Sequence, residues 1–363
     1  MIVEASLKPW LALSLTRGLG DESARRLLMQ FGSPDAVFTA SIGSLKAIVK
    51  ADVAAEISKG VLDDAVAPAL DWLEDSNNHI VTLADSDYPQ ALLNIPDPPL
   101  LLYVKGRLDL LNHAALAVVG SRNATPQGIN NAEAFAKSLS DAGLSIISGM
   151  AHGIDAASHR GALRGQGSSI AVVGTGLDKI YPAANRDLAH ALAQQGTLIS
   201  ELPLGTPPLA ANFPRRNRLI SGMSLGCLVV EASLQSGSLI TARLALEQGR
   251  DVFAIPGSIH APQSKGCHAL LKQGAKLVET AQDILEELGG LLVSPAQAAN
   301  SEGTDSKGQD TALLEHLGFD PVDVDTLSTR CGLTIAELSA MLLSLELEGS
   351  ICVLPGGLYQ RIH

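Results

Sequence analysis

Apolar and polar positions divide the chain into three stretches with different periodicities. In residues 1–75 apolar side chains recur at helical spacing, and a loop with Gly18 and Gly20 precedes a helix that we expect Asp21 to cap. This stretch is predicted to be a helical domain. It is either a sterile-alpha-motif-like or helix–hairpin–helix-like module whose glycine loop approaches a phosphate, or a plain bundle in which that loop is a tight turn.

A second pattern covers residues 76–290, where short continuous apolar runs alternate with amphipathic helical stretches. Such runs are typical of a parallel sheet covered on both faces. We therefore expect an α/β domain with an extended Rossmann-like, doubly wound parallel sheet. The predicted strands are 79–83, 100–104, 116–119, 144–148, 169–173, 197–200, 227–231 and 252–255, and the predicted helices are 127–141, 155–164, 186–194 and 238–248.

The composition changes after residue 290. Residues 291–310 are rich in Ser, Ala, Gln, Asn and acids and predict a linker. Residues 311–363 predict a winged helix, with helices 325–331 and 334–348 and a hairpin of 351–354 and 358–362. Thr334 and Glu337 form a capping box. The second helix carries no Lys or Arg, which favours protein contact over reading of a DNA groove; its acids are Glu337, Glu346 and Glu348.

Charge is distributed unevenly over the 363 residues. The net charge is −12, which disfavours a general nucleic-acid binder. However, residues 1–112 contribute −6 and residues 289–363 contribute −7, whereas residues 113–288 have 14 basic and 13 acidic side chains. Only the middle of the chain is therefore expected to accept a polyanion. The acidic flanks suit solubility or protein partners.

Cysteines and hydropathy indicate the compartment. The thiols are widely spaced without a C-x-x-C pair, which predicts neither a disulfide framework nor a metal site: Cys227, Cys267, Cys331 and Cys352. No apolar run approaches the roughly 18–20 residues that a membrane helix needs. Glu4 and the shortness of the apolar run 10–15 argue against a signal sequence. We expect a soluble, cytoplasmic protein with no membrane association.

Several predicted strands end in glycine-rich turns. Ligands bind at the carboxyl ends of the strands in an open parallel sheet, and glycines permit close approach of backbone N–H groups. We therefore expect an extended phosphate-lined groove, with these members: Gly120, Ser121, Arg122, Gly149, Gly153, Gly174 and Gly176. Ser236-Gly237-Ser238 either adds donors, Ser238 among them, or simply caps a helix.

These turns do not match a dinucleotide site. The first reads GSRNATPQG, which breaks the G-x-G-x-x-G spacing, and no acid directly follows the second strand. No nicotinamide or other cofactor is therefore expected. His152, Asp155 and His159 lie at i, i+3 and i+7 and are open to a metal or acid–base role, but we favour a structural one in which Asp155 caps its helix or fixes the loop before it.

The densest cationic motif is FPRRNR at residues 213–218. Guanidinium groups beside an aromatic ring suit phosphate contacts combined with base stacking, which adds Phe213, Arg215, Arg216, Asn217 and Arg218 to the candidate site. If the segment is helical, Arg215 and Arg218 share one face and Arg216 points elsewhere. The alternative is a solvated helix face that pairs with acids. We favour binding because the surrounding segment has few charges.

The order of these motifs resembles the DNA-processing protein A family, DprA or Smf. The motifs are GSR at 120–122, SGMAHGID at 148–155, GTGLDKIYP at 174–182, FPRRNRLISG at 213–222 and SGSLITARLALEQGRDVFAIPGS at 236–258. The resemblance implies a non-catalytic protein of natural transformation and DNA recombination. Such a protein binds and protects incoming single-stranded DNA, helps to load the RecA recombinase and forms a homodimer through its Rossmann domain. It implies DNA contacts for Arg122, Phe213, Arg215, Asn217 and Arg218.

Two other function classes stay open from the sequence. One is a Rossmann-fold hydrolase that acts on a nucleotide or a phosphorylated sugar, with His152 or Asp155 as acid–base; its expected PGGxGT signature is reduced to Pro256-Gly257. The other is an adaptor that uses its acidic flanks and binds no nucleic acid. Dimer geometry, the nucleotides bound per subunit and the partner of the winged helix are not predicted.

Overall fold

The computed structural model describes residues 2–292, 322–331, 351–354 and 358–361, and the single positions 313, 317, 333, 338, 341, 342 and 345. It forms two compact units, Met1–Val293 and Ser294–His363, which are described separately. No helix in the described ranges is long and apolar enough to cross a membrane.

The first unit begins with the helical region, as predicted. Its helices are α1 (Ile2–Leu15), α2 (Asp21–Phe31), α3 (Pro34–Thr39), α4 (Ile42–Lys46), α5 (Ala51–Ile57) and α6 (Asp63–Trp72). Leu27 of α2 and Val53 of α5 are buried in a core that α1 to α5 share. Gly18 has φ +79° in the tight turn before α2. The prediction that Asp21 caps α2 is wrong: Gly20 occupies the cap position, and the Asp21 carboxylate instead meets Arg215.

The α/β region is built on a nine-stranded sheet with the order β1-β2-β6-β5-β4-β3-β7-β8-β9. Strands β3 to β9 run parallel to one another, whereas β2 runs antiparallel to β6 and β1 antiparallel to β2. The strands are β1 (Asn78–Thr82), β2 (Leu101–Gly106), β3 (Ala115–Val119), β4 (Ser145–Ser148), β5 (Ser169–Val172), β6 (Thr197–Ser200), β7 (Gly226–Val229), β8 (Asp251–Ala254) and β9 (Lys276–Leu277).

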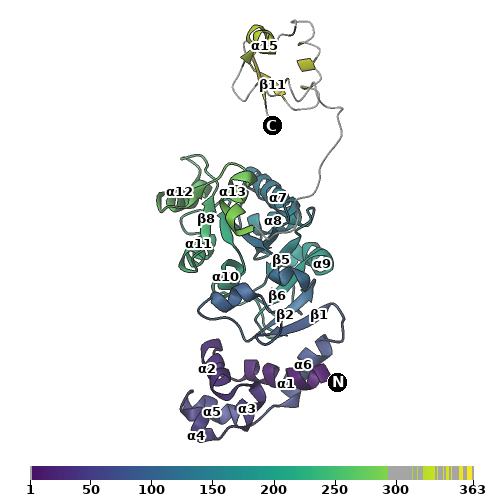
Figure 1. Ribbon diagram of the computed structural model, residues 1–363, viewed down its shortest axis with the longest axis vertical. Coiled ribbons are helices and arrows are strands. Elements are labelled where there is room, and N and C mark those ends of the chain that lie inside the picture. Colours follow the sequence, from purple (N-terminus) through teal and green to yellow (C-terminus); the bar gives the residue numbers. More distant parts are fainter. Residues whose placement is uncertain are drawn as a thin grey trace. The chain divides into compact units, whose positions relative to one another are not determined.

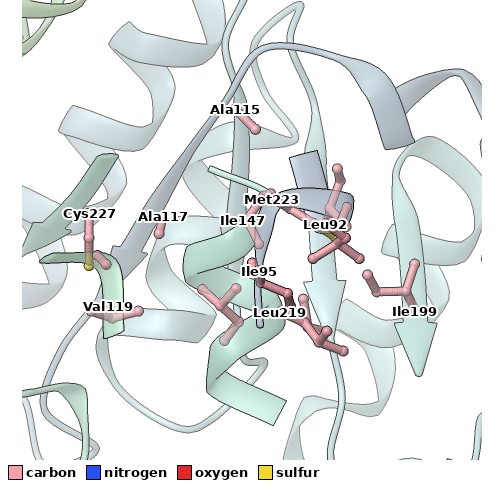
Figure 2. Packing of buried hydrophobic residues seen from close by; sticks show 14 of the residues in the cluster. Leu92, Ile95, Ala115, Ala117, Val119, Ile147, Ile199, Leu219, Met223 and Cys227 are labelled. Carbon is pink, nitrogen blue, oxygen red and sulfur yellow. The ribbon is translucent and has the colours of Figure 1, made fainter. Parts of the chain in front are cut away.

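Helices cover both faces of this sheet, which confirms the doubly wound prediction (Figure 1). They are α7 (Pro126–Asp141), α8 (Ile154–Ala162), α9 (Arg186–Gln195), α10 (Asn212–Gly222), α11 (Ser238–Glu247), α12 (Lys265–Lys272) and α13 (Ala281–Leu292). Leu116 and Val118 of β3 pack with α7, α8 and α13. The alternate residues Ala117 and Val119 pack with α10, α11 and α12, and Figure 2 shows them beside Cys227 of β7, which pairs with Ala117. This alternation explains why the strands are continuously apolar.

The helical region and the sheet share apolar contacts. Leu11 of α1 and Val66 of α6 lie in one buried cluster with Leu101 and Tyr103 of β2. The Trp72 ring lies edge-on to Tyr103, with 5.9 Å between centroids. The two regions are therefore joined by a core as well as by the chain.

The second unit has the hairpin of a winged helix. Strands β11 (Ile351–Leu354) and β12 (Leu358–Arg361) are antiparallel, and β10 (Val322–Asp323) pairs with β12. Helix α15 (Val324–Cys331) contributes Leu327 to a small core. The predicted linker 291–310 lies outside the described residues except for its first two positions. The capping box and the acids of the second helix lie wholly outside them.

Candidate nucleic-acid site

A pocket of about 630 Å³ opens at the carboxyl edge of the sheet. The chain passes from β3 through β4 and β5 to β6 on one side, then crosses to β7 on the other side of β3. Loops diverge at such a switch point and leave a crevice. Seven predicted residues line the pocket: Gly120, Ser121, Arg122, Phe213, Arg216, Asn217 and Ser238. Six others do not: Gly149, Gly153, Gly174, Gly176, Arg215 and Arg218.

Two aromatic rings and two arginines form the centre of the pocket. The rings of Phe213 and Tyr181 have centroids 5.6 Å apart and are tilted by 42°. The Cζ atoms of Arg122 and Arg216 lie 5.7 and 5.9 Å from the Phe213 centroid, within the range of cation–π attraction. Tyr181 is 44% exposed and Arg122 is exposed, so this group faces solvent.

Arg216 is the buried member of this group. It is only 4% exposed, and its Nη1 donates to the carbonyl oxygens of Gly149, at 2.8 Å, and Val172. Burial lowers the pKa of Arg216 to about 10, and the nearby Asp155 carboxylate opposes that shift. Its Nε has no hydrogen-bond partner. Arg216 therefore places a fixed positive charge at the inner wall of the pocket.

Arg215 and Arg218 lie on the other face of α10, as the helical spacing predicted. Both contact Asp21 and Glu201 instead of the pocket. We expected Arg218 to share a cationic groove with Arg122. The structure corrects this placement, because Arg218 is paired with carboxylates and lines no part of the pocket.

The glycines of the turns after the strands, here called the rim glycines, leave room for neighbouring protein groups: Gly120, Gly149, Gly153, Gly174 and Gly176. A Cβ atom at Gly149 would lie 2.6 Å from Nη2 of Arg216, and one at Gly174 would lie 3.0 Å from the Phe213 ring. The Gly149 amide already donates to Asp155 at 3.2 Å. We expected Gly149 and Gly174 to line a groove for phosphates. Instead, their missing side chains allow Arg216 and the Phe213 ring to approach the strand ends.

Gly120 and Gly176 also lie against neighbouring protein groups that leave no room for a side chain. A Cβ at Gly120 would meet Ile154 at 2.6 Å, and one at Gly176 would meet Asp178 at 2.5 Å. The Gly176 amide donates to the Thr206 carbonyl at 3.1 Å. These positions require glycine for packing between neighbouring loops.

Gly153 provides a test of this packing. Gly153→Ala should lower the free energy of unfolding by about 1–3 kcal/mol more than Gly143→Ala does. Both glycines have positive φ, +74° and +91°, but only at Gly153 would a Cβ meet a backbone oxygen, that of Ser121 at 2.3 Å. Urea denaturation measures both costs. Equal losses would contradict the packing explanation.

Asp155 and His159 have structural partners, and His152 is exposed. Asp155 accepts the amides of Gly149 and Ala151, so it fixes the loop before its helix, the alternative we favoured. Burial raises the pKa of Asp155, and Arg216 opposes this. His159 is fully buried, bonds Ser169 through Nδ1 at 2.7 Å, and has its pKa lowered to about 3 by burial. Among the described residues no cluster of His, Cys, Asp and Glu is suited to a metal ion.

The Ser236–Ser238 turn lies at the pocket and at the start of α11, but the cap position is held by Gly237, and no side chain makes a capping hydrogen bond. The three residues line the pocket, and α11 begins at Ser238. The Ser236 and Ser238 hydroxyls lie 2.6 Å apart, and the Ser238 amide donates to Ser236 Oγ at 3.4 Å. The two hydroxyls therefore bond each other beside the pocket, and a contribution of Ser238 to binding stays a prediction.

The prediction from sequence missed several pocket residues. Tyr181 is the most prominent, and the remaining polar ones are Asn123, Ser233, Gln235, Thr241 and Gln263. An aromatic residue in a loop after a strand at the sheet's carboxyl edge was the available signal for Tyr181. The other polar residues carried no such signal, because they lie in segments of ordinary polar composition.

Comparison with known proteins places this architecture in a class. Residues 79–289 match the family model described as DNA recombination-mediator protein A, and residues 294–357 match the DprA winged helix domain. The chain therefore combines the Rossmann-like domain and winged helix of DNA recombination mediators. It belongs to the DNA recombination-mediator protein A family, DprA or Smf.

Individual relatives support this membership. Protein Smf of Escherichia coli K12 is 47% identical over 306 residues, which are 82% of this chain and 81% of that protein. The X-ray structure of DprA from Streptococcus pneumoniae is similar with a TM-score of 0.69 and 39% identity, covering 77% of this chain and 97% of that one. DNA processing protein A from Helicobacter pylori, solved to study its single-stranded DNA binding mode, has a TM-score of 0.54 and 31% identity over 58% of this chain and 96% of that one.

Proposed function

We propose that this protein binds single-stranded DNA, without sequence preference and without catalysis, in the pocket at the carboxyl edge of its sheet. The observation that carries this proposal is the Phe213 ring, which has Tyr181 beside it and Arg122 and Arg216 within cation–π range. Sequence-tolerant binding of single strands combines cations for the backbone with rings on which bases stack.

The exposure of each pocket residue indicates its proposed role in DNA binding. Arg122 is exposed and is the proposed phosphate ligand, whereas the buried Arg216 fixes the ring and adds positive potential. Ser121, Asn217 and Ser238 offer polar groups along the wall. The structural partners of Asp155 and His159 favour binding over acid–base catalysis.

Family membership supports a role in processing DNA during natural transformation. The similarity to the Helicobacter pylori protein, whose single-stranded DNA binding mode was studied, supports the choice of ligand. Protection of incoming DNA in the cytoplasm, loading of RecA recombinase and homodimer formation through the α/β region are proposals that rest on the resemblance. The acidic flanks, −6 over residues 1–112 and −7 over residues 289–363, suit protein partners for such steps.

Arg122→Ala tests the phosphate assignment. It should weaken binding to all sequences equally and make the slope of log Kobs against log salt about 0.7 shallower for each phosphate that the variant no longer binds. Fluorescence anisotropy with labelled oligo-dT at several salt concentrations measures both. Arg160→Ala removes the same charge outside the pocket lining and should change neither quantity appreciably. Unchanged affinity in Arg122→Ala would refute the assignment.

A further inference from the structure

The face of α10 that points away from the pocket contacts three carboxylates, here called the carboxylate cluster: Asp21, Asp97 and Glu201. Arg218 donates from Nε to Asp97 at 2.7 Å and from Nη2 to Glu201 at 2.6 Å. Arg215 donates to Asp21 at 2.9 Å and to Glu201 at 3.2 Å. Two cations therefore meet three anions.

The burial of these arginine–carboxylate contacts makes them unsuitable as a phosphate site. The side chains of Arg218 and Glu201 are 8% and 3% exposed. The remaining nitrogen of Arg218, Nη1, has no hydrogen-bond partner but is shielded from solvent. A phosphate would have to displace carboxylates and open the packing to reach Arg218. Only Arg215, 52% exposed, is accessible.

The carboxylate cluster joins three distant segments of the chain. Asp21 is the first residue of α2 in the helical region, Asp97 lies among the prolines of loop 95–100 before β2, and Glu201 follows β6. Arg25 of α2 strengthens the same junction by donating to the Pro96 carbonyl at 2.6 Å. Helix α10 is therefore held on one face by the helical region and presents its other face to the pocket.

We propose that Arg218 and Glu201, with Asp21 and Asp97, are positioning residues that set α10, and with it Phe213 and Arg216, for single-stranded DNA. The helical region is thereby coupled to a site that it does not line. This inference rests on the proposed function of the pocket. It assigns to Arg218 a role different from the phosphate contact that its motif implied.

Removing a carboxylate distinguishes a positioning role from a masking role, because the two predict opposite changes in the affinity for DNA. If the cluster positions α10, Glu201→Gln and Asp21→Asn should each weaken oligo-dT binding, Glu201→Gln by about fivefold or more, with an unchanged salt slope. If the acids only mask phosphate-binding arginines, the same changes should tighten binding and steepen the slope, because a negative charge is lost and a cation is freed. Tighter or unchanged binding would overturn the proposal.

Controls keep the test interpretable. Glu133→Gln removes an acid that pairs with Arg160 and Arg164, outside the pocket lining, and should leave affinity near that of the wild type. Asp21 is less buried than Glu201, so Asp21→Asn serves if Glu201→Gln does not fold, as judged by thermal unfolding. Failure of the proposed function itself would look different: the wild type would not bind oligo-dT at any salt concentration.

Discussion

Arg216→Met should lower the free energy of unfolding by about 3–5 kcal/mol, because it removes a buried cation whose charge offsets the burial of the Asp155 carboxylate. Asp155, 8% exposed, would keep its two amide donors but lose the nearby cation that counteracts burial. The carbonyls of Gly149 and Val172 would also lose their donor. Chemical denaturation at fixed pH measures the loss. Arg215→Met, on the half-exposed side of the same helix, should cost less than about 1 kcal/mol.

The pH dependence of this loss tests the part played by Asp155. Burial raises the pKa of Asp155 in the folded state above its unfolded value of 3.8, and loss of Arg216 raises it further. A carboxyl group with a raised folded pKa favours folding at low pH and loses that contribution as pH rises through the window above 3.8. The deficit of Arg216→Met relative to the wild type should therefore be larger at about pH 8 than at about pH 5.

Comparison with the wild type at each pH is essential. The pKa of buried His159 is lowered from 6.5 to about 3, so both proteins lose stability as pH falls below 6.5. Adding Asp155→Asn to Arg216→Met should recover part of the loss and remove the part of its extra pH dependence that comes from Asp155. An equal deficit at both pH values, unaffected by Asp155→Asn, would contradict this explanation.

Apolar patterning predicted most of the sheet because its strands are buried on both faces. Runs such as 116–119 and 197–200 are apolar or small throughout and end where glycine or acid begins, so their observed ends agree within one residue. The two-residue strand β9 and the helices α12 and α13 lie after the last predicted strand. A strand as short as Lys276–Leu277 has no periodicity to detect, because only its pairing with β8 defines it.

The arginine motif shows where prediction from sequence ends. Helical spacing separates Arg216 from Arg215 and Arg218, but all three carry the same charge, so the spacing does not reveal which face meets the pocket. That choice depends on Asp21 and Asp97, which lie more than 100 residues earlier in the chain. The rim glycines present the same problem: the sequence shows the missing Cβ, and only the fold shows that Arg216 and Phe213 occupy the space.

Phe213→Ala should weaken binding of oligo-dT by about 10- to 100-fold, the loss of roughly 1–3 kcal/mol expected when one base no longer stacks on a ring. Phe213 is half-buried at the pocket and contacts Tyr181 and two arginines, so the change also removes the surface that orients Arg122. Anisotropy titrations at one salt concentration give the affinity. Phe213→Trp keeps a stacking surface and should retain most of the affinity for oligo-dT.

An abasic oligonucleotide distinguishes stacking from a general disturbance of the pocket. It has the same phosphates as oligo-dT but no bases, so the wild type should bind it more weakly. For Phe213→Ala the difference between the two ligands should shrink, with Tyr181 accounting for what is left. If Phe213→Ala lost affinity for both ligands by the same factor, the ring would act only by supporting the arginines. Because Arg122 lies over the same ring, Arg122→Ala should show the opposite pattern: a similar loss for both ligands, since each presents the same phosphate charge.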